Sequence, residues 1–407
     1  MTDITDAKSR SATSHAFDVI VIGAGIQGAG VAQAMAAEGY RVALVEQAER
    51  PASGTSSKSS KLIHGGLRYL ETAQWSLVRE CLQERRILTR IAPELVTMKP
   101  FYLPVYQHQK RSPLWIHCGL LLYRLLGGGR YQRHSPQKAV ELGLRSEGLT
   151  ALFEYRDAQT DDVKLTHAVV ASAKALGTAC LFNFRVSTIA QLSRGYTISA
   201  DDGRTITASA VVNATGPFVN RVAQYCRAWP TLAIDLVQGS HLILDLPAPP
   251  GCIYTESPDD GRAVFLLPWY GKLMVGTTEL SRGEQPELNE VTPQERDYLL
   301  RVAAHALADI DVSTIKIIEA FSGLRVLPQS DNGGPQGARA GSALNKKARD
   351  TRLLHQLSQT HQYIAIYGGK LTAYRAVAQK VVAQLKPHHP PSGKRKALTH
   401  EIPLSFS

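Results

Sequence analysis

The sequence predicts an α/β protein in which a βαβ unit opens the ordered part of the chain. The first observation is the stretch Phe17–Glu46, which has the pattern of a strand, a glycine turn, a helix and a second strand. The second is a pair of later strands, Val211–Ala214 and Gln362–Tyr367, which lead to Gly216 and to Gly368. The third is the alternating apolar pattern between 232 and 278, which favours antiparallel strands and therefore a second, α+β part.

The turn after the first strand has the spacing G-x-G-x-x-G, at Gly23, Gly25 and Gly28. The first glycine permits a tight turn, the second lets the backbone approach a pyrophosphate, and the third lets the helix pack closely. Backbone N–H groups at the helix start would then hold the phosphate charge. Glu46 follows Gly25 by 21 residues and ends the second strand, where it can accept from a ribose hydroxyl. This combination predicts a dinucleotide site; the alternative is a glycine turn that binds no ligand.

Length and composition narrow the class of protein. The chain has 407 residues, enough for two domains or one large discontinuous domain. Its formal net charge of +11 suits anionic substrates or anionic lipid. We expect no nucleic-acid partner, because no basic motif with interleaved aromatic residues is present. The five scattered cysteines favour reduced thiols in a cytoplasmic protein, and we expect no metal site.

A Ser- and Gly-rich run, Arg50–Glu71, follows the nucleotide unit. Such a run is usually a solvent-exposed loop, but a loop of this length inside a compact domain is more often functional. Gly65 and Gly66 would let the backbone lie against a flat ring, with Lys61, His64 and Arg68 nearby.

A short apolar segment, Leu114–Leu126, has the length of about three and a half helical turns. It is too short to span a bilayer, and the sequence contains no run of 18 apolar residues. One interpretation is a helix of the core. The other is an interfacial helix that directs Arg111, Arg124 and Arg130 toward lipid headgroups.

Seven segments, in this order, resemble the family of FAD-dependent glycerol-3-phosphate dehydrogenases: FDVIVIGAGIQGAG, SSKLIHGGLRYLE, VVNATGPFV, QGSHLIL, LLPWYGKLMVGTTE, SGLRVLP and YGGKLTAYR. The match extends roughly from Phe17 to Leu385. SSKLIHGGLRYLE and the GGKLTAYR part of the last segment are far more specific than the glycine motif. The resemblance implies a glutathione-reductase-like FAD-binding (Rossmann) domain with an inserted α+β substrate domain built on an antiparallel sheet.

This resemblance and the local patterns together predict how the chain is divided. A disordered arm would precede two interleaved domains, and a flexible basic tail would follow them. The substrate domain would contain the possible membrane-surface helix 113–126. The predicted ranges are 1–16 for the arm; 17–90, 150–225 and 316–386 for the FAD-binding domain; 91–149 and 226–315 for the substrate domain; and 387–407 for the tail.

The resemblance also implies an activity. The protein would oxidise sn-glycerol 3-phosphate to dihydroxyacetone phosphate, passing hydride to flavin N5 and electrons on to a quinone or another acceptor. The expected location is cytoplasmic, with peripheral attachment to the inner face of the cytoplasmic membrane as a variant, and a homodimer is left open. Two alternatives are an FAD-dependent oxidase of amino or 2-hydroxy acids, and a truncated FAD-binding paralogue without dehydrogenase activity.

The substrate of such an enzyme is a phosphate monoester, close to dianionic at neutral pH. Arginine binds such a group bidentately, so Arg68 and Arg325 are the candidate phosphate ligands, with Tyr69 beside Arg68. His241 is the candidate general base, because the ordinary pKa of histidine lies near working pH. Lys370 could bond a substrate oxygen or flavin N5. The alternatives are surface salt bridges, a structural histidine and a solvated turn lysine.

The predicted cofactor ligands come from the glycine turn, the Ser-rich loop, two strand ends and the start of the last helix. A helix opening at Thr372 would point its positive end at the pyrimidine part of flavin. The set is Gly23, Gly25, Ile26, Gly28, Glu46, Thr55, Ser56, Ser60, Lys61, His64, Gly65, Gly66, Val186, Ala214, Gly216, Gly369, Lys370, Leu371 and Thr372.

The sequence departs from the family pattern in two respects. Family members usually continue into a C-terminal helical domain, whereas this sequence ends at Ser407, about where that domain would begin. Ala348 and Ala373 stand where the family tends to have Ser and Thr, which bears on substrate affinity.

Overall fold

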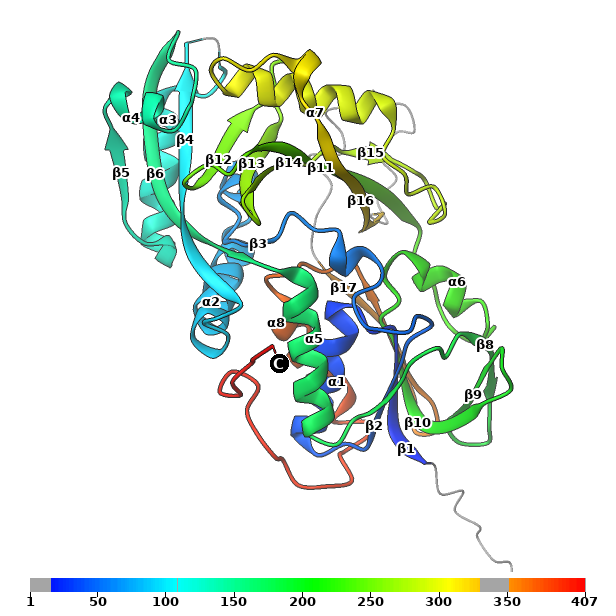
Figure 1. Cartoon of the computed structure of the whole chain (residues 1–407). Coiled ribbons are helices and arrows are strands. Elements are labelled where there is room, and N and C mark those ends of the chain that lie inside the picture. Colours follow the sequence, from blue (N-terminus) through cyan, green and yellow to red (C-terminus); the bar gives the residue numbers. More distant parts are fainter. Residues whose placement is uncertain (1–15, 108, 330–350, 407) are drawn as a thin grey trace, which may run out of the picture.

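The structure, a computed structural model, describes residues 16–107, 109–329 and 351–406. Two sheets, one of eight and one of ten strands, organise these residues (Figure 1). The predicted disordered arm lies outside the described residues except for Ala16, and so does Ala348.

The first sheet has a parallel centre, as expected of a nucleotide-binding unit. Its strand order is β17-β18-β10-β1-β2-β7, and β10 also pairs with β9, which pairs with β8. β1 lies between β10 and β2 and is parallel to both, while β17 is antiparallel at the edge. The strands are β1 (Phe17–Ile22), β2 (Val42–Val45), β7 (Ala179–Leu181), β8 (Val186–Gln191), β9 (Tyr196–Ala200), β10 (Thr205–Asn213), β17 (Arg352–Leu357) and β18 (Gln362–Tyr367).

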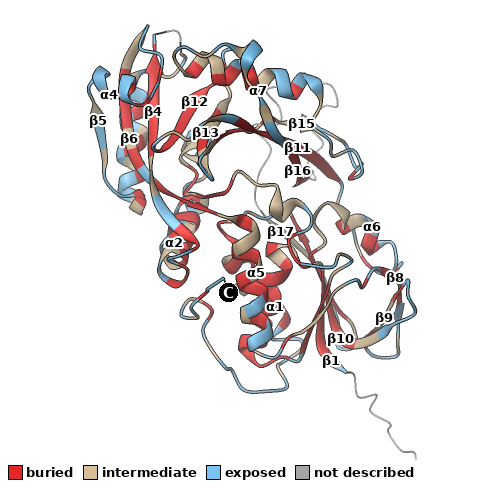
Figure 2. Ribbon diagram, in the orientation of Figure 1, coloured by how far each residue is buried: buried red, intermediate tan, exposed pale blue. Residues whose placement is uncertain are grey.

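Three helices pack together against this sheet: α1 (Ile26–Glu38), α5 (Asp162–Ala175) and α8 (Tyr374–Leu385). Small residues of α1 allow the close packing, because a Cβ at Gly30 would lie 2.6 Å from the Tyr374 ring. The short helices η4 (Gly216–Phe218) and α6 (Val219–Ala223) follow β10. Figure 2 shows α1 and the central strands largely buried.

The second sheet is antiparallel between neighbouring strands except where β12 runs parallel to β4. Its order is β15-β11-β14-β13-β12-β4-β6-β3, with β16 paired to β11 and β5 to β6. The strands are β3 (Leu62–Ile63), β4 (Val96–Tyr106), β5 (Tyr131–His134), β6 (Leu149–Thr160), β11 (Ile234–Pro247), β12 (Cys252–Glu256), β13 (Ala263–Trp269), β14 (Lys272–Gly276), β15 (Leu280–Ser281) and β16 (Ile317–Pro328).

Helices cover the outer parts of this sheet. α7 (Pro293–Ala306) begins with a capping box of Thr292 and Glu295 and packs against β11 and β14; η5 (Val312–Thr314) follows it. α2 (Trp75–Ile91), α3 (Pro113–Tyr123), its continuation η3 (Arg124–Gly128) and α4 (Pro136–Glu141) lie toward β4–β6.

α3 has one buried side and one exposed side, and its buried side is that of a core helix. Ile116, Leu120 and Tyr123 are buried against the second sheet. The opposite side is also apolar but exposed: Leu114 by 71%, Trp115 by 60%, Leu121 by 43% and, in η3, Leu125 by 75%. Across the described ranges, no helix combines the length and the apolar character needed to cross a bilayer.

The predicted boundaries at 150 and 316 are corrected by the strand pairing. They place β6 and β16 in the FAD-binding domain, yet both strands hydrogen-bond within the second sheet. Apolar alternation indicates that a segment is a strand, but it does not indicate which strand is the partner.

The prediction of a flexible tail is wrong for residues 387–406. The Gly393 N–H donates to the Gly39 carbonyl at 3.0 Å, Arg395 pairs with Glu38, and Leu404 is 3% exposed. Lys396 Nζ donates to the Leu176 carbonyl, at the C-terminal end of α5. Basic composition favours a solvated chain, but cations also stabilise the carbonyl ends of helices, and Lys396 does so here.

Candidate functional site

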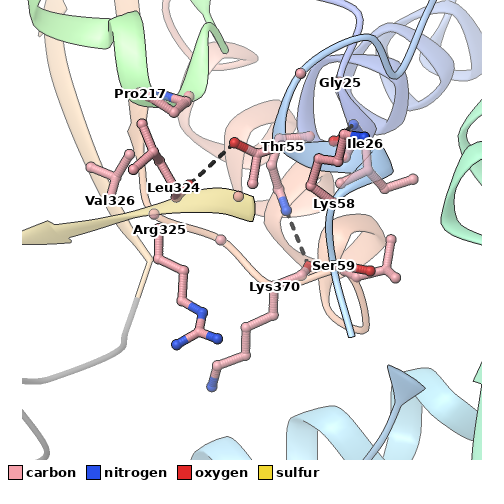
Figure 3. A pocket seen from close by; sticks show the side chains of 18 of the residues that line it. Gly25, Ile26, Thr55, Lys58, Ser59, Pro217, Leu324, Arg325, Val326 and Lys370 are labelled. Atoms are coloured by element: carbon pink, nitrogen blue, oxygen red, sulfur yellow. Dashed lines mark hydrogen bonds between the residues drawn. The ribbon is translucent and has the colours of Figure 1, made fainter. Parts of the chain in front are cut away.

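A cavity of about 810 Å³ is lined by residues of both sheets. One end is formed by the glycine turn after β1 and by Glu46. The other is formed by β11, β13 and β16 together with η2 (Leu67–Thr72) and the loop before α8. The site therefore joins the predicted nucleotide ligands to the predicted substrate residues, and Figure 3 shows part of this lining.

Glycine is required at the nucleotide end. Gly23 has φ +100°, and a Cβ there would lie 2.8 Å from the Ala214 carbonyl oxygen. A Cβ at Gly28 would overlap the Gly23 carbonyl oxygen at 1.8 Å. Both glycines thus bring α1 close against the ends of β1 and β10, which leaves the N-terminus of α1 facing the cavity.

Polar groups at this end are arranged around the start of α1. The Ile26 N–H, at the first position of α1, donates to Ser56 Oγ at 2.9 Å. Glu46 accepts from the N–H groups of Ala24 at 2.7 Å and Ala48 at 3.0 Å. An anion binds at such a helix start, and a carboxylate fixed at the strand end suits a ribose. The residues present therefore fit a dinucleotide.

The Ser-rich loop packs on β16. Thr55, in η1 (Thr55–Ser57), donates through Oγ1 to the Leu324 carbonyl at 3.2 Å (Figure 3). A Cβ at Gly323 would lie 2.8 Å from the Lys58 carbonyl oxygen, so the two backbones are in close contact. Ser60 Oγ lies 2.9 Å from His241 Nε2, which ties the loop to β11 as well.

Lys61, predicted as a cofactor ligand, has a different place. Its ammonium is buried and contacts Asp162 at 2.7 Å and the Ser57 carbonyl at 2.6 Å. An ammonium buried with a carboxylate partner is part of the internal structure. Lys61 therefore anchors the loop to the start of α5, and its charge is paired with the Asp162 carboxylate inside the protein.

Gly65 also differs from expectation. A Cβ there would lie 2.3 Å from the Tyr123 hydroxyl, so the flat ring beside this glycine is a protein side chain. The flanking residues His64 and Gly66 do line the cavity. His64 is held from the other side, because its N–H donates to Thr372 Oγ1 at 3.2 Å.

Most of the predicted cofactor set lines the cavity. Gly28, Lys61 and Gly65 are the members that lie behind the lining in packing or anchoring positions. Those that line it are Gly23, Gly25, Ile26, Glu46, Thr55, Ser56, Ser60, His64, Gly66, Val186, Ala214, Gly216, Gly369, Lys370, Leu371 and Thr372.

The substrate end gathers cations from three separate elements. Arg68 and Tyr69 come from η2, Arg325 from β16 and Lys370 from the loop before α8, and all four line the cavity. Lys370 Nζ lies 4.1 Å from the centre of the Tyr69 ring and makes no hydrogen bond to another described residue. In Figure 3, Arg325 and Lys370 point in the same direction. This clustering suits a small dianion.

Three residues at this end, Arg262, Thr277 and Glu279, were missed by the sequence reasoning. Glu279 is 6% exposed and lies between two arginines: Arg262 at 2.6 Å and Arg325 at 3.3 Å. The Thr277 hydroxyl also lies 3.4 Å from Arg325. Glu279 stands at the end of LLPWYGKLMVGTTE, but Arg262 follows a plain Asp-Asp-Gly turn that carries no functional signal.

His241 lies in the cavity wall but not in the state that was predicted. It is 1% exposed, and burial lowers its pKa to about 3, assisted by the positive charges of Arg325 and Lys61. The ring stacks on Phe321 with centres 5.0 Å apart. The expectation of an ordinary pKa near working pH is therefore wrong. The imidazole is neutral at neutral pH, and its Nδ1 makes no hydrogen bond to the other described residues.

Two further observations limit what the site contains. Ala373 is buried at the N-cap of α8 and does not belong to the cavity lining, so this departure lies behind the site. Within the described part of the chain, no group of three or more His, Cys, Asp or Glu side chains is arranged to hold a metal ion.

Comparison with known sequences places the chain in a family. Residues 18–375 match the family described as FAD dependent oxidoreductase. A glycerol-3-phosphate dehydrogenase of Pseudomonas tolaasii is 34% identical, over 92% of this chain and 72% of the relative. The aerobic glycerol-3-phosphate dehydrogenase of Escherichia coli is 32% identical, over 91% and 74%. A D-erythritol 1-phosphate dehydrogenase of Brucella abortus is also 32% identical, over 95% and 76%.

Solved structures agree with this placement. The glycerol-3-phosphate dehydrogenase of Bacillus halodurans complexed with FAD has a TM-score of 0.72 at 26% identity, covering 96% of this chain and 68% of the other. An FAD-bound L-alpha-glycerophosphate oxidase of Mycoplasma pneumoniae has the same TM-score at 17% identity, over 91% and 94%, and so shares the fold. With a site that fits the dinucleotide, the chain belongs to the FAD-dependent oxidoreductases, in the glycerol-3-phosphate dehydrogenase family, and its cofactor is FAD.

Proposed function

We propose that the protein oxidises sn-glycerol 3-phosphate to dihydroxyacetone phosphate. The observation that carries this proposal is the cluster of Arg68, Arg325 and Lys370 on the cavity that also receives the nucleotide-binding turn. The reaction removes two electrons and two protons from a secondary alcohol, one proton leaving with the electrons as hydride. When bound, FAD supplies the two-electron oxidant, and the chain must bind the phosphate, orient the alcohol and accept the hydroxyl proton.

Arg68 and Arg325 are the proposed phosphate ligands. Their guanidinium groups can each donate two parallel hydrogen bonds to phosphate oxygens. Glu279 and Thr277 contact the terminal nitrogens of Arg325, which limits the orientations of that side chain before substrate arrives. Tyr69 and Lys370 line the same cavity, with Lys370 Nζ against the Tyr69 ring, and from there Lys370 Nζ can donate to a substrate oxygen.

His241 is the proposed acceptor of the hydroxyl proton, at Nδ1. Its Nε2 is already paired with Ser60, and the neutral ring has its other nitrogen without a partner among the described residues. A pKa of about 3 describes a weak base, but one of its causes is the charge of Arg325. A phosphate dianion bound to Arg325 offsets that charge and therefore raises the pKa of His241 when substrate is present.

The second sheet is proposed to form a substrate domain inserted in a glutathione-reductase-like FAD-binding domain. β3 to β6 lie in the chain between β2 and β7 of the first sheet, and β11 to β16 lie between β10 and β17. The second sheet is thus made of two excursions from the first, and its strands β11 and β16 bring His241 and Arg325 to the cavity.

Rapid mixing without oxygen tests the activity. The FAD-loaded protein is mixed with glycerol 3-phosphate, D-erythritol 1-phosphate, glycine or lactate, and flavin absorbance is followed. Fast bleaching by glycerol 3-phosphate supports the proposal, while faster bleaching by D-erythritol 1-phosphate would assign a longer polyol phosphate. Bleaching by glycine or lactate alone supports an amino- or hydroxy-acid oxidase, and no bleaching by any of them supports a paralogue without dehydrogenase activity.

A quinone is the proposed electron acceptor, met at the inner face of the cytoplasmic membrane. Support comes from the exposed apolar side of α3 and η3, beside the exposed Arg124 and Arg130. Arg111 is excluded from this role because it pairs with Glu71 and Glu256. The basic cluster Lys394–Lys396 is excluded too, since Arg395 and Lys396 are engaged near the end of α1, far from α3 (Figure 1).

A further inference from the structure

The loop between β3 and η2 is attached to the protein interior through one backbone N–H. The Gly65 N–H donates to the Tyr123 hydroxyl at 3.0 Å and to Asp157 at 3.3 Å. The Tyr123 hydroxyl in turn donates to the same Asp157 oxygen at 2.7 Å. Tyr123 and Asp157 are each 1% exposed, so the loop is tied to a buried cluster behind the cavity wall.

Both carboxylate oxygens of Asp157 accept hydrogen bonds within this cluster. Arg85 contacts the other Asp157 oxygen at 2.6 Å and donates to the carbonyls of Arg156 at 3.1 Å and Gly128 at 3.3 Å. Burial raises the pKa of Tyr123 well above its usual value, and the Asp157 charge adds to this. The phenol therefore stays protonated, its oxygen accepting from Gly65 while its hydrogen goes to Asp157.

Tyr123 has little freedom to move within this cluster. A Cβ at Gly65 would lie 2.3 Å from its hydroxyl, and a Cβ at Gly128 would lie 2.1 Å from its ring. Two glycines in separate parts of the chain thus leave room for one ring. A well-packed ring of this kind fixes the position of its hydroxyl, and with it the position of the Gly65 N–H.

The orientation of one peptide group follows. In a trans peptide the carbonyl and the N–H point in opposite directions. Because the Gly65 N–H points into the interior, the His64 carbonyl points the other way. Thr372 Oγ1 lies on that side, 3.5 Å from the His64 carbonyl oxygen, and both His64 and Thr372 line the cavity.

We propose that Tyr123 and Asp157 are positioning residues for the cofactor, holding the His64–Gly65 peptide so that the His64 carbonyl offers a hydrogen-bond acceptor to a ring N–H of bound FAD. The proposal depends on FAD being the cofactor and does not depend on which alcohol is oxidised. Loss of the Tyr123 hydroxyl leaves the loop packed but lets this peptide rotate. The expected consequences are weaker FAD binding and a changed electronic environment of the flavin.

Tyr123→Phe tests this in the FAD-loaded protein. The dissociation constant of FAD should rise roughly three- to tenfold, the range for one internal hydrogen bond. The visible absorbance bands and the midpoint potential of the bound flavin should both shift. Tyr40→Phe is the matched control, because Tyr40 is 2% exposed and donates to the His389 carbonyl at 2.7 Å, away from the cavity. This control should leave all three flavin properties unchanged.

A double variant separates positioning from simple loss of stability. Thr372→Val removes the hydroxyl that lies 3.5 Å from the His64 carbonyl oxygen, so it acts on the same peptide group, and it also removes the acceptor of the His64 N–H in the preceding peptide. The effects of Tyr123→Phe and Thr372→Val on FAD affinity should therefore be non-additive in the double variant. Additive effects would overturn the proposal, and so would Tyr123→Phe behaving like Tyr40→Phe in affinity, spectrum and potential. Failure of glycerol 3-phosphate to bleach the wild-type flavin would defeat the proposed function and leave this test intact.

Discussion

The two ends of the cavity are built by different means. The nucleotide end consists mainly of backbone: the turn at Gly23, the first N–H groups of α1 and one carboxylate, Glu46, within a single stretch of chain. The substrate end consists of charged side chains, among them Arg68 and Arg325, which lie far apart in the sequence. Changes at the first end should therefore affect cofactor content and folding together, whereas changes at the second should reduce catalysis with FAD retained.

The largest effect is expected for Gly28→Ala at the nucleotide end. The new Cβ would overlap the Gly23 carbonyl oxygen, so the turn must move. We expect destabilisation of about 3 kcal/mol or more and a protein purified without flavin colour, measured by absorbance and thermal unfolding.

Gly119→Ala is the matched control for this change. Gly119 lies in α3, and an added Cβ there has no neighbour within 4 Å. Because alanine favours the helix, this variant should be as stable as wild type or more stable by about 0.5–1 kcal/mol. A yellow, stable Gly28→Ala protein would show that the turn tolerates a side chain. It would contradict the expectation that changes at the nucleotide end affect folding and cofactor content together.

Arg325→Ala and Arg68→Ala come next, at the substrate end. Each substitution should lower kcat/KM for glycerol 3-phosphate. The expected loss of transition-state stabilisation is about 2–5 kcal/mol, because a charge-assisted contact is lost in a partly closed site. The FAD content should equal that of wild type. Arg301→Ala, which removes an exposed pair with Asp259, is the control and should change kcat/KM little. An equal loss on glycerol without phosphate would contradict the role in phosphate binding.

His241 gives a smaller effect that can be read from pH. Its pKa is about 3 in the folded protein and about 6.5 when unfolded. Below pH 6.5 the unfolded chain therefore binds a proton that the folded chain does not. The free energy of unfolding consequently decreases as the pH is lowered. His241→Gln should remove roughly 2 kcal/mol of the loss between pH 7 and pH 5. Denaturant unfolding of the apoprotein at both pH values measures this.

The same residue can be tested in catalysis. His241→Ala should lower turnover while FAD content stays intact, and part of the rate should return at high pH, where hydroxide can replace the base. If turnover at saturating substrate is unchanged while chemistry limits the rate, His241 does not accept the proton. For the pH dependence of stability, an identical loss toward pH 5 in wild type and His241→Gln would show that the buried imidazole does not cause that loss.

The contrast between the two ends also explains what the sequence could predict. The G-x-G-x-x-G spacing encodes a local structure, so the spacing alone predicts that Gly23, Ile26 and Glu46 lie close together, and the structure has all three lining one cavity. For the substrate end, local pattern indicates strands β11 and β16 but not that they pair with each other. Only the resemblance to a family brings Arg68 and Arg325 together.

At the site, the departures from expectation share a physical cause, which is contact with residues distant in the sequence. Lys61 lies in a polar, Ser-rich run of the kind that is usually a solvent-exposed loop, yet its ammonium is buried and pairs with Asp162. The imidazole of His241 has an ordinary pKa until burial and Arg325 lower it. The Arg262–Glu279 pair is formed by residues 17 positions apart in the chain, and no spacing rule relates them. Such effects depend on neighbours that a single sequence does not reveal.

The remaining expected effect concerns neither end of the cavity but the exposed apolar side of α3 and η3. Leu121→Glu combined with Leu125→Glu should weaken binding to anionic liposomes by about 1–2 kcal/mol per leucine, because partly exposed side chains would bury apolar area in the bilayer. Arg124 and Arg130 add about 1 kcal/mol each near an anionic surface, so binding should also weaken with salt. Val140→Glu, 64% exposed on α4, is the control. Cosedimentation measures all variants; if wild type stays in the supernatant with neutral and anionic liposomes at low salt, α3 meets no membrane, and a soluble acceptor or oxygen becomes the better proposal.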